Sequence, residues 1–121
     1  MTIKSHKDLE VYKESMELVT LVYRLANTFP SDEKFGLTSQ IKRAAISIPS
    51  NLAEGAARKS SKEFIQFLHI SLGSLSEIET QLDLAHRLGF VETSKEINEK
   101  VHYLFILLTR LISSIKKKVN K

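Results

Sequence analysis

The residues best suited to hold a metal are two histidines, each placed three positions after a carboxylate. These pairs are Asp83 with His86 and Glu99 with His102. In four-helix bundles, paired motifs of this spacing bind two metal ions when further inward-facing carboxylates complete the site. The apolar stripe of the last predicted helix turns Glu99 away from the core, and residues 24–28 supply no carboxylate. We therefore predict no metal and no cofactor, with these side chains on the surface.

Other catalytic chemistry also lacks support in the sequence. The chain has no cysteine, which excludes disulfides, thiolate metal sites and a cysteine nucleophile. It has no glycine-rich phosphate loop and no Ser-His-Asp spacing. His69 lies among aromatic and apolar positions, which favours a hydrogen-bonded histidine at an interface over a catalytic base. We predict that the protein is not an enzyme and takes no small-molecule substrate.

A polar stripe recurs every three or four residues along the segment 40–58, so its members share one side of a helix. It consists of Gln40, Arg43, Ser47, Asn51, Glu54 and Arg58. Alanines beside the stripe would let another helix approach closely. Three interpretations remain open, namely a solvated face, a hydrogen-bond network that is buried or at an interface, and a ligand-binding ladder.

Basic clusters are the features that could bind a polyanion, in a chain with a formal net charge of +4. If the helices run alternately up and down, the cluster around Arg58 and the cluster that begins at Lys116 lie at one end of the bundle. The same lysines could instead be solvated and complement a helix dipole, and both interpretations stay open. Without an aromatic RNA-binding motif, binding would follow backbone and shape rather than base sequence. The clusters are Lys42 with Arg43, Arg58 and Lys59 with Lys62, and Lys116, Lys117 and Lys118 with Lys121.

The elements that must position these groups are long helices, because glycine and proline are sparse. Apolar periodicity predicts an all-α protein of one domain, residues 1–121, folded as an antiparallel up-down-up-down four-helix bundle. The helices are expected at about residues 7–28, 32–58, 61–87 and 93–117.

Local signals set these boundaries. Ser31 is expected to cap the second helix, with Gly36 as a weak point in its first turn. Ser60 with Glu63, and Thr93 with Glu96, have the spacing of capping boxes. Gly89 suits the position just after a helix. Pro49 predicts a kink in the second helix, or else a split into two short helices.

Each predicted helix has an apolar stripe for the core, and several helices carry a second stripe. The second stripes include Leu18, Val22 and Leu25 in the first helix, and Ile65, Phe67, Ile70 and Leu72 in the third. Excess apolar surface predicts self-association. The predicted core stripes are Leu9, Tyr12, Met16, Val19, Tyr23 and Ala26; Leu37, Ile41, Ala44, Ile48, Leu52 and Gly55; Phe64, Leu68, Ser71, Leu75, Ile78, Leu82 and Ala85; and Ile97, Val101, Leu104, Leu108, Leu111 and Ile115.

Targeting signals are not visible in the sequence. The first ten residues have no apolar region of a signal peptide. No apolar run approaches the ~18 residues that span a bilayer. We predict a cytoplasmic protein with no membrane contact.

The segment FGLTSQIKRAA at 35–45, followed by SIPSNLAEG at 47–55, resembles the four-helix bundle protein family known as 23S ribosomal RNA intervening-sequence proteins. The DLEVY segment at 8–12, the Phe29-Pro30 break, residues 64–74 and the Leu88-Gly89 pair are also similar to that family. Tyr12 departs from it, because the family often has tryptophan there. The resemblance covers essentially the whole chain.

The resemblance implies a ring-like homo-oligomer, most often a pentamer. It also extends to accessory proteins of diversity-generating retroelements, which are basic pentamers that bind nucleic acid and a reverse transcriptase. It therefore implies an accessory or scaffold protein with RNA or DNA as its partner. The family offers no catalytic residues to carry over. The alternative is a protein–protein interaction module that binds no nucleic acid.

Overall fold

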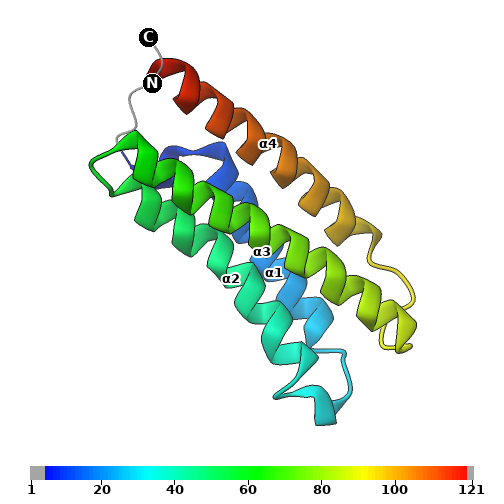
Figure 1. Ribbon diagram of the computed structural model, residues 1–121. Coiled ribbons are helices and arrows are strands. Elements are labelled where there is room, and N and C mark those ends of the chain that lie inside the picture. Colours follow the sequence, from blue (N-terminus) through cyan, green and yellow to red (C-terminus); the bar gives the residue numbers. More distant parts are fainter. Residues whose placement is uncertain (1–4, 120–121) are drawn as a thin grey trace.

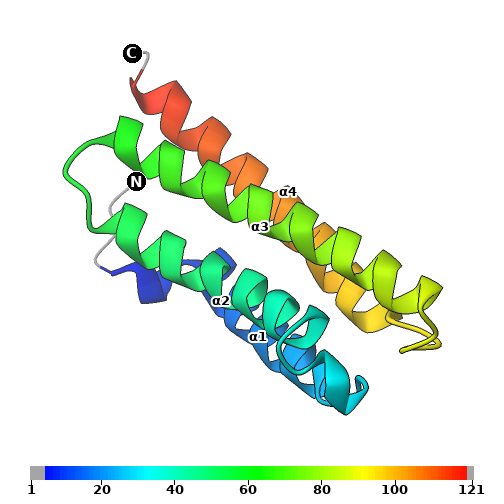
Figure 2. The same cartoon turned by 60° about the horizontal axis from the view of Figure 1, so that its bottom comes forward.

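Four long helices form an antiparallel bundle in the computed structural model, which describes residues 5–119. They are α1 (Glu10–Ala26), α2 (Leu37–Ala56), α3 (Ser61–Arg87) and α4 (Lys95–Val119). Each helix packs against the next along the chain, and α4 returns to pack against α1 (Figures 1 and 2). The predicted all-α, up-down-up-down architecture is confirmed.

The first helix starts later than the sequence predicts. Residues His6–Asp8 form a short 3-10 turn, and Leu9 then adopts an extended conformation with φ −74° and ψ 132°. This residue separates the turn from α1, so the helix begins at Glu10 rather than at residue 7. It ends at Ala26 instead of 28, ahead of the Phe29-Pro30 break.

Ser31 does not cap α2, and that prediction is wrong. Residues Ser31–Glu33 form a separate 3-10 turn, and α2 begins only after Gly36, whose φ of −110° and ψ of −117° break the chain direction. The carboxylate of Glu33 instead accepts a hydrogen bond from the backbone N–H of Leu37, at 3.1 Å. This bond satisfies one of the free amide groups at the helix start.

Pro49 lies inside α2, which continues as one helix to Ala56. The alternative of two short helices is therefore wrong. A proline here removes the hydrogen bond to the carbonyl of Ala45 and bends the helix without ending it. The helix stops two residues before the predicted end at 58.

The bounds of α3 agree with the prediction at both ends. The hydroxyl of Ser60 accepts a hydrogen bond from the backbone N–H of Glu63 at 3.1 Å, as the capping box requires. At the other end Gly89 has a φ of +77°. The backbone N–H groups of Gly89 and Phe90 donate to the carbonyls of His86 and Ala85, which forms a complete Schellman motif.

The start of α4 is capped by Ser94 rather than by Thr93. The carbonyl of Ser94 accepts the first helical hydrogen bond, from the backbone N–H of Asn98. Thr93 contributes only a long hydrogen bond of 3.4 Å, accepted from the backbone N–H of Lys95. The helix therefore begins at Lys95, two residues after the predicted start, and runs to Val119.

The predicted core stripes of α2 and α3 are buried at every position. In α4, Ile112 takes the buried place expected for Leu111. In α1 the prediction holds for Ala26 but is otherwise wrong, because the helix is rotated so that Leu18 and Val22 of its second stripe face inward. The buried residues of α1 are Val11, Ser15, Leu18, Val22 and Ala26.

The closest packing in the bundle joins α2 to α3. A Cβ atom on Gly55 would lie 2.7 Å from the Cβ atom of Phe67, a distance that side chains do not tolerate. Small residues on both helices permit this approach. The hydroxyl of Ser71, fully buried, donates across the same seam to the carbonyl of Ile48 at 3.3 Å.

Candidate nucleic-acid interface

Two basic clusters lie at the same end of the bundle, which holds both the α2–α3 turn and the end of α4 (Figures 1 and 2). The two clusters share this end because α2 and α4 run in the same direction in the antiparallel bundle. All six side chains are exposed. We call this group the basic end, and it consists of Arg58, Lys59, Lys62, Lys116, Lys117 and Lys118. Lys121, which the sequence adds to the cluster, lies outside the described residues.

Within the basic end, Arg58 is the residue held in place. Its guanidinium lies 3.3 Å from the carboxylate of Glu54 and 5.0 Å from the centre of the Phe67 ring. The lysines of the basic end form no ion pair with any described residue. Their positive charge is therefore available to an external anion, whereas that of Arg58 is shared with Glu54.

Lys42 and Arg43 do not join the basic end. The end of α2 at Ala56 lies thirteen or more positions after them, which is roughly 20 Å at about 1.5 Å per residue, and Arg58 follows that end. Lys42 is half-buried and donates to the side-chain oxygen of Asn27 at 2.9 Å, with its ammonium 4.7 Å from the Tyr23 ring centre. Arg43 is exposed and lines a shallow hollow between α2 and α3.

The polar stripe of α2 divides into parts with different surroundings. Its centre is a hydrogen-bonded chain across the α2–α3 seam. The side chain of Asn51 donates to the hydroxyl of Ser47 at 2.9 Å, and the hydroxyls of Ser47 and Ser74 lie 2.8 Å apart. Ser74 donates onward to the carbonyl of Ile70. The outer members, Gln40, Arg43, Glu54 and Arg58, are exposed.

Gln81 is a buried polar residue that sequence reasoning missed. It is 6% exposed, and its side-chain oxygen has no hydrogen-bond partner among the described residues. It belongs to the buried face of α3, four residues after Glu77 in the neighbouring hollow. The signal that could have found it is the helical period, because Gln81 lies three residues after Ile78 and four before Ala85, both of which are buried.

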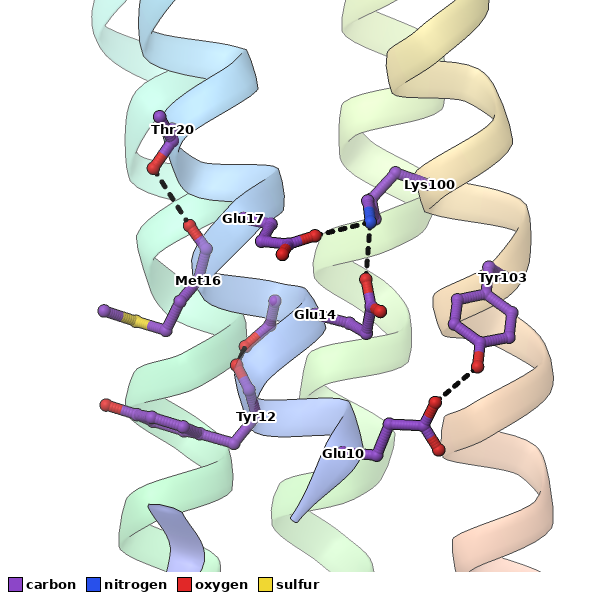
Figure 3. A network of polar contacts seen from close by, with 9 residues as sticks. Glu10, Tyr12, Glu14, Met16, Glu17, Thr20, Lys100 and Tyr103 are labelled. Carbon is purple, nitrogen blue, oxygen red and sulfur yellow. Dashed lines mark hydrogen bonds and ion pairs between the residues drawn. The ribbon is translucent and has the colours of Figure 1, made fainter. Parts of the chain in front are cut away.

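The most extensive polar network joins α1 to α4 (Figure 3). The ammonium of Lys100 donates to the carboxylates of Glu14 and Glu17, the latter at 2.7 Å. The hydroxyl of Tyr103 donates to the carboxylate of Glu10. These partners are more than eighty positions apart in the chain, so only the antiparallel register of the two helices brings them together.

The electrostatics of this network oppose catalysis. Hydrogen bonds to Glu14 and Glu17 raise the pKa of Lys100, so the lysine remains an ammonium and is a poor nucleophile. The hydrogen bond to Glu10 raises the pKa of the Tyr103 hydroxyl, which disfavours it as a base. The hydrogen bond from Lys100 lowers the pKa of Glu17. The arrangement is suited to holding two helices together.

The carboxylate–histidine pairs are only partly brought together. His86, Glu99 and His102 line one hollow of about 590 Å³ at the α3–α4 corner, but Asp83 does not line it. Among residues 5–119 no group of three or more histidine and carboxylate side chains is arranged to hold a metal ion. His86 instead lies 2.9 Å from the hydroxyl of Ser94 and ties the end of α3 to the start of α4.

The Ser94–His86 contact has the two members of a nucleophile–base pair but a different role. Ser94 is buried and also accepts a hydrogen bond from the side chain of Asn98 at 3.0 Å. No carboxylate within the described chain orients the imidazole of His86 by a hydrogen bond, as a catalytic triad requires. His69, which the sequence predicts at an interface, is exposed in the single chain.

Comparison with known proteins gives one consistent family. A model of the 23S rRNA-intervening sequence protein family matches residues 7–114. The chain is similar to a solved protein of unknown function from the S23 ribosomal protein family of Bacteroides thetaiotaomicron, at 27% identity and a TM-score of 0.78. That similarity covers 85% of this chain and 95% of the other. No curated protein matches the chain.

Proposed function

The chain belongs to the 23S rRNA-intervening sequence protein family, and we propose that it is a non-catalytic homo-oligomeric accessory protein that binds structured RNA or DNA through its basic end. The observation that carries this proposal is the gathering of exposed lysines from two separate elements at one end of the bundle. The family name itself links its members to ribosomal RNA genes. The link to retroelements that the sequence resemblance implies stays a prediction.

The chemistry of the basic end favours recognition of the phosphate backbone. Each lysine that neutralises a phosphate releases a condensed counterion, so affinity rises with the number of contacts and falls steeply with salt. The aromatic ring that contacts this group through Arg58, Phe67, is half-buried and has the guanidinium of Arg58 over it. A base could not stack on that face without displacing Arg58. Binding by shape and charge is therefore favoured over reading of bases.

Assembly would strengthen this binding. One basic end carries too few charges for tight binding at physiological salt, but several copies in a ring would present their basic ends to one polyanion. Linked sites raise the apparent affinity well beyond that of a single site. Homo-oligomerisation and nucleic-acid binding thus support each other in one function.

The test is binding of the purified protein to a hairpin RNA and a duplex DNA over a series of salt concentrations. We expect micromolar or tighter affinity at low salt, weakening steeply as salt rises. The variant Arg58→Glu/Lys59→Glu/Lys62→Glu should lose binding. A matched control is Lys34→Glu/Arg87→Glu/Lys95→Glu, which changes net charge equally with exposed residues outside the basic end. The control should bind like the wild type, apart from a small general effect of charge.

Two results would overturn the proposal. The first is absence of binding even at low salt. The second is an equal loss in both triple variants, because binding would then depend on net charge and not on the basic end.

A second candidate function is a protein–protein interaction module without nucleic-acid binding. The observation that favours it is an apolar groove between α1 and α2, lined by Met16, Ile46 and neighbouring residues. An oligomeric wild type that binds neither RNA nor DNA would select this function.

None of the helices within residues 5–119 combines the length and apolar character needed to cross a membrane.

A further inference from the structure

Helix α1 is apolar on two faces, of which one is fully buried in the core and the other packs against it only in part. The buried face includes Leu18 and Val22, both fully covered. The second face consists of Tyr12, Met16, Val19 and Tyr23, spaced four, three and four residues apart. Met16 is 46% exposed in the single chain, and the other three are half-buried. A monomeric bundle needs one apolar face per helix, so the second face requires another explanation.

This second face forms a groove with α2. Side chains of Tyr12, Met16 and Val19 line one wall, and those of Ile46, Pro49 and Ala53 line the other, enclosing about 330 Å³. Ile46 is 42% exposed. A continuous apolar groove along two helices is suited to receive a third helix lengthwise.

The charges beside the groove are positive. Lys42 lies over the ring of Tyr23 at one end of the face, 4.7 Å from its centre. Lys13 is exposed and is an i,i+3 neighbour of Met16 on the surface of α1. The occupant of the groove should therefore combine an apolar ridge with an acidic group.

Helix α3 carries a ridge of that kind on its outer surface. Ile70, Gly73, Glu77 and Leu84 are spaced three, four and seven residues apart, so they share one side of the helix. Ile70 is 49% exposed and Leu84 is 45% exposed. Glu77 is exposed and forms no ion pair with any described residue.

Gly73 is the most informative residue of this ridge. Glycine in the middle of a helix lowers stability relative to alanine, and it is tolerated where a close contact excludes a side chain. The glycine at position 55 has such a contact inside the chain, with Phe67. A Cβ atom on Gly73 would meet nothing within 4 Å. Any close contact that explains Gly73 must therefore come from outside the chain.

We propose that the groove between α1 and α2 of one copy receives the α3 ridge of a second copy. This inference rests on the homo-oligomeric part of the proposed function and names its interface. The groove offers apolar walls and lysines, and the ridge offers exposed Ile70 and Leu84, a flat place at Gly73 and the carboxylate of Glu77. Because the two surfaces differ and lie on different helices, each copy binds one neighbour with its groove and another with its ridge. Repetition of such a head-to-tail contact gives a ring when the rotation between neighbouring copies closes.

The experiment uses two variants that each remove one surface. Met16→Glu puts a charge into the groove, and Ile70→Glu puts one onto the ridge. Both residues are exposed in the single chain, so the fold should survive, which circular dichroism checks. Each variant alone should raise the dissociation constant of self-assembly about tenfold or more, because a charge is costly to bury without a partner. Gly73→Arg, which fills open space in the single chain, should act like Ile70→Glu.

Mixing the two variants gives the sharper result. The ridge of Met16→Glu and the groove of Ile70→Glu are intact, so the mixture should form a one-to-one heterodimer that neither variant forms alone. Native mass spectrometry detects it as twice the chain mass of 13.8 kDa, with both masses represented. Ser113→Glu, at an exposed site on α4, is the control that should assemble like the wild type.

The possible negative results separate this inference from the proposed function. If the wild type is oligomeric and both variants remain so, or if mixing restores nothing, the interface lies elsewhere and this inference is overturned while homo-oligomerisation stands. A wild type that is monomeric at about 100 µM overturns the inference and the oligomeric part of the proposed function together. RNA and DNA binding is measured in a separate assay, so its absence does not change the conclusions about self-assembly.

Discussion

Replacing Gly55 by alanine should destabilise the fold by forcing α2 away from α3. The added Cβ atom would lie 2.7 Å from the Cβ of Phe67 and 3.0 Å from a ring carbon of Phe64. The Phe64 ring can rotate, but the Cβ of Phe67 is fixed to the backbone, so a helix must shift. Overpacking of this kind costs about 1–3 kcal/mol, which outweighs the ~0.5–1 kcal/mol that alanine gains over glycine in a helix.

Gly73→Ala is the matched control, since the same substitution in α3 meets open space. The gain in helix propensity is common to both variants, although smaller for Gly55 near the end of α2. The difference between them therefore isolates the steric cost and should be about 1–3 kcal/mol, with Gly55→Ala the less stable. Because assembly adds to apparent stability, urea unfolding is measured at a dilution where the chain is monomeric and repeated at a second concentration.

Two further results bear on the reasoning. Phe67→Leu should not rescue Gly55→Ala, because leucine keeps the Cβ atom that causes the conflict. Equal stability of Gly55→Ala and Gly73→Ala would refute the claim that the α2–α3 distance depends on the missing side chain at position 55.

Three other experiments test separate parts of the structure. Lys100→Met should destabilise the α1–α4 contact at neutral pH. Because the network lowers the pKa of Glu17 and raises that of Lys100, its contribution is present above the unfolded pKa of Glu17 and below that of Lys100. The stability difference from wild type in urea titrations should therefore shrink below about pH 4 and above about pH 10, and a difference independent of pH would contradict this. Gly89→Ala should cost about 1 kcal/mol in thermal unfolding, since its φ of +77° disfavours a side chain, and an unchanged melting temperature would argue against the Schellman motif. A double-mutant cycle of Ser47→Ala and Ser74→Ala should give a coupling of about 0.5–1.5 kcal/mol, whereas additive effects would mean that their hydrogen bond contributes nothing.

The sequence by itself predicted the fold class and one helix to its exact bounds. The capping box of Ser60 with Glu63 and the glycine at position 89 are local devices, so they act through neighbouring backbone groups and can be read without tertiary information. Apolar periodicity likewise identified the buried faces of α2 and α3, because the longest stripe of 3,4 spacing in each of those helices is the one that packs into the core.

The start of α2 is where local signals misled. Ser31 with two acids after it has the composition of a helix start. Gly36, however, adopts a non-helical backbone conformation, and the helix begins only at Leu37. Residues 31–36 can form either the first turn of a longer helix or a separate 3-10 turn, and a propensity argument cannot weigh that three-residue turn against the tertiary packing of the helix that follows.

The sequence predicts one part of the candidate sites and not another, because some contacts follow from helix order and others depend on tertiary packing. Topology alone brings the α2–α3 turn and the end of α4 together, so the basic end could be expected from helix order. The network of Lys100 with Glu14 and Glu17 depends on the axial register of α1 against α4, and nothing in either helix alone specifies that register.

Tertiary structure decided which face of α1 turns inward. Both of its stripes have the 3,4 spacing of an amphipathic helix, so periodicity cannot choose between them. Packing buries the face of Leu18 and Val22, where even Ser15 fits because its hydroxyl donates to the carbonyl of Tyr12 at 2.7 Å. The larger side chains of Tyr12 and Tyr23 stay half-buried at the edge of the core and Met16 is exposed, because a close-packed core accepts only the side chains that fit the space between four helices.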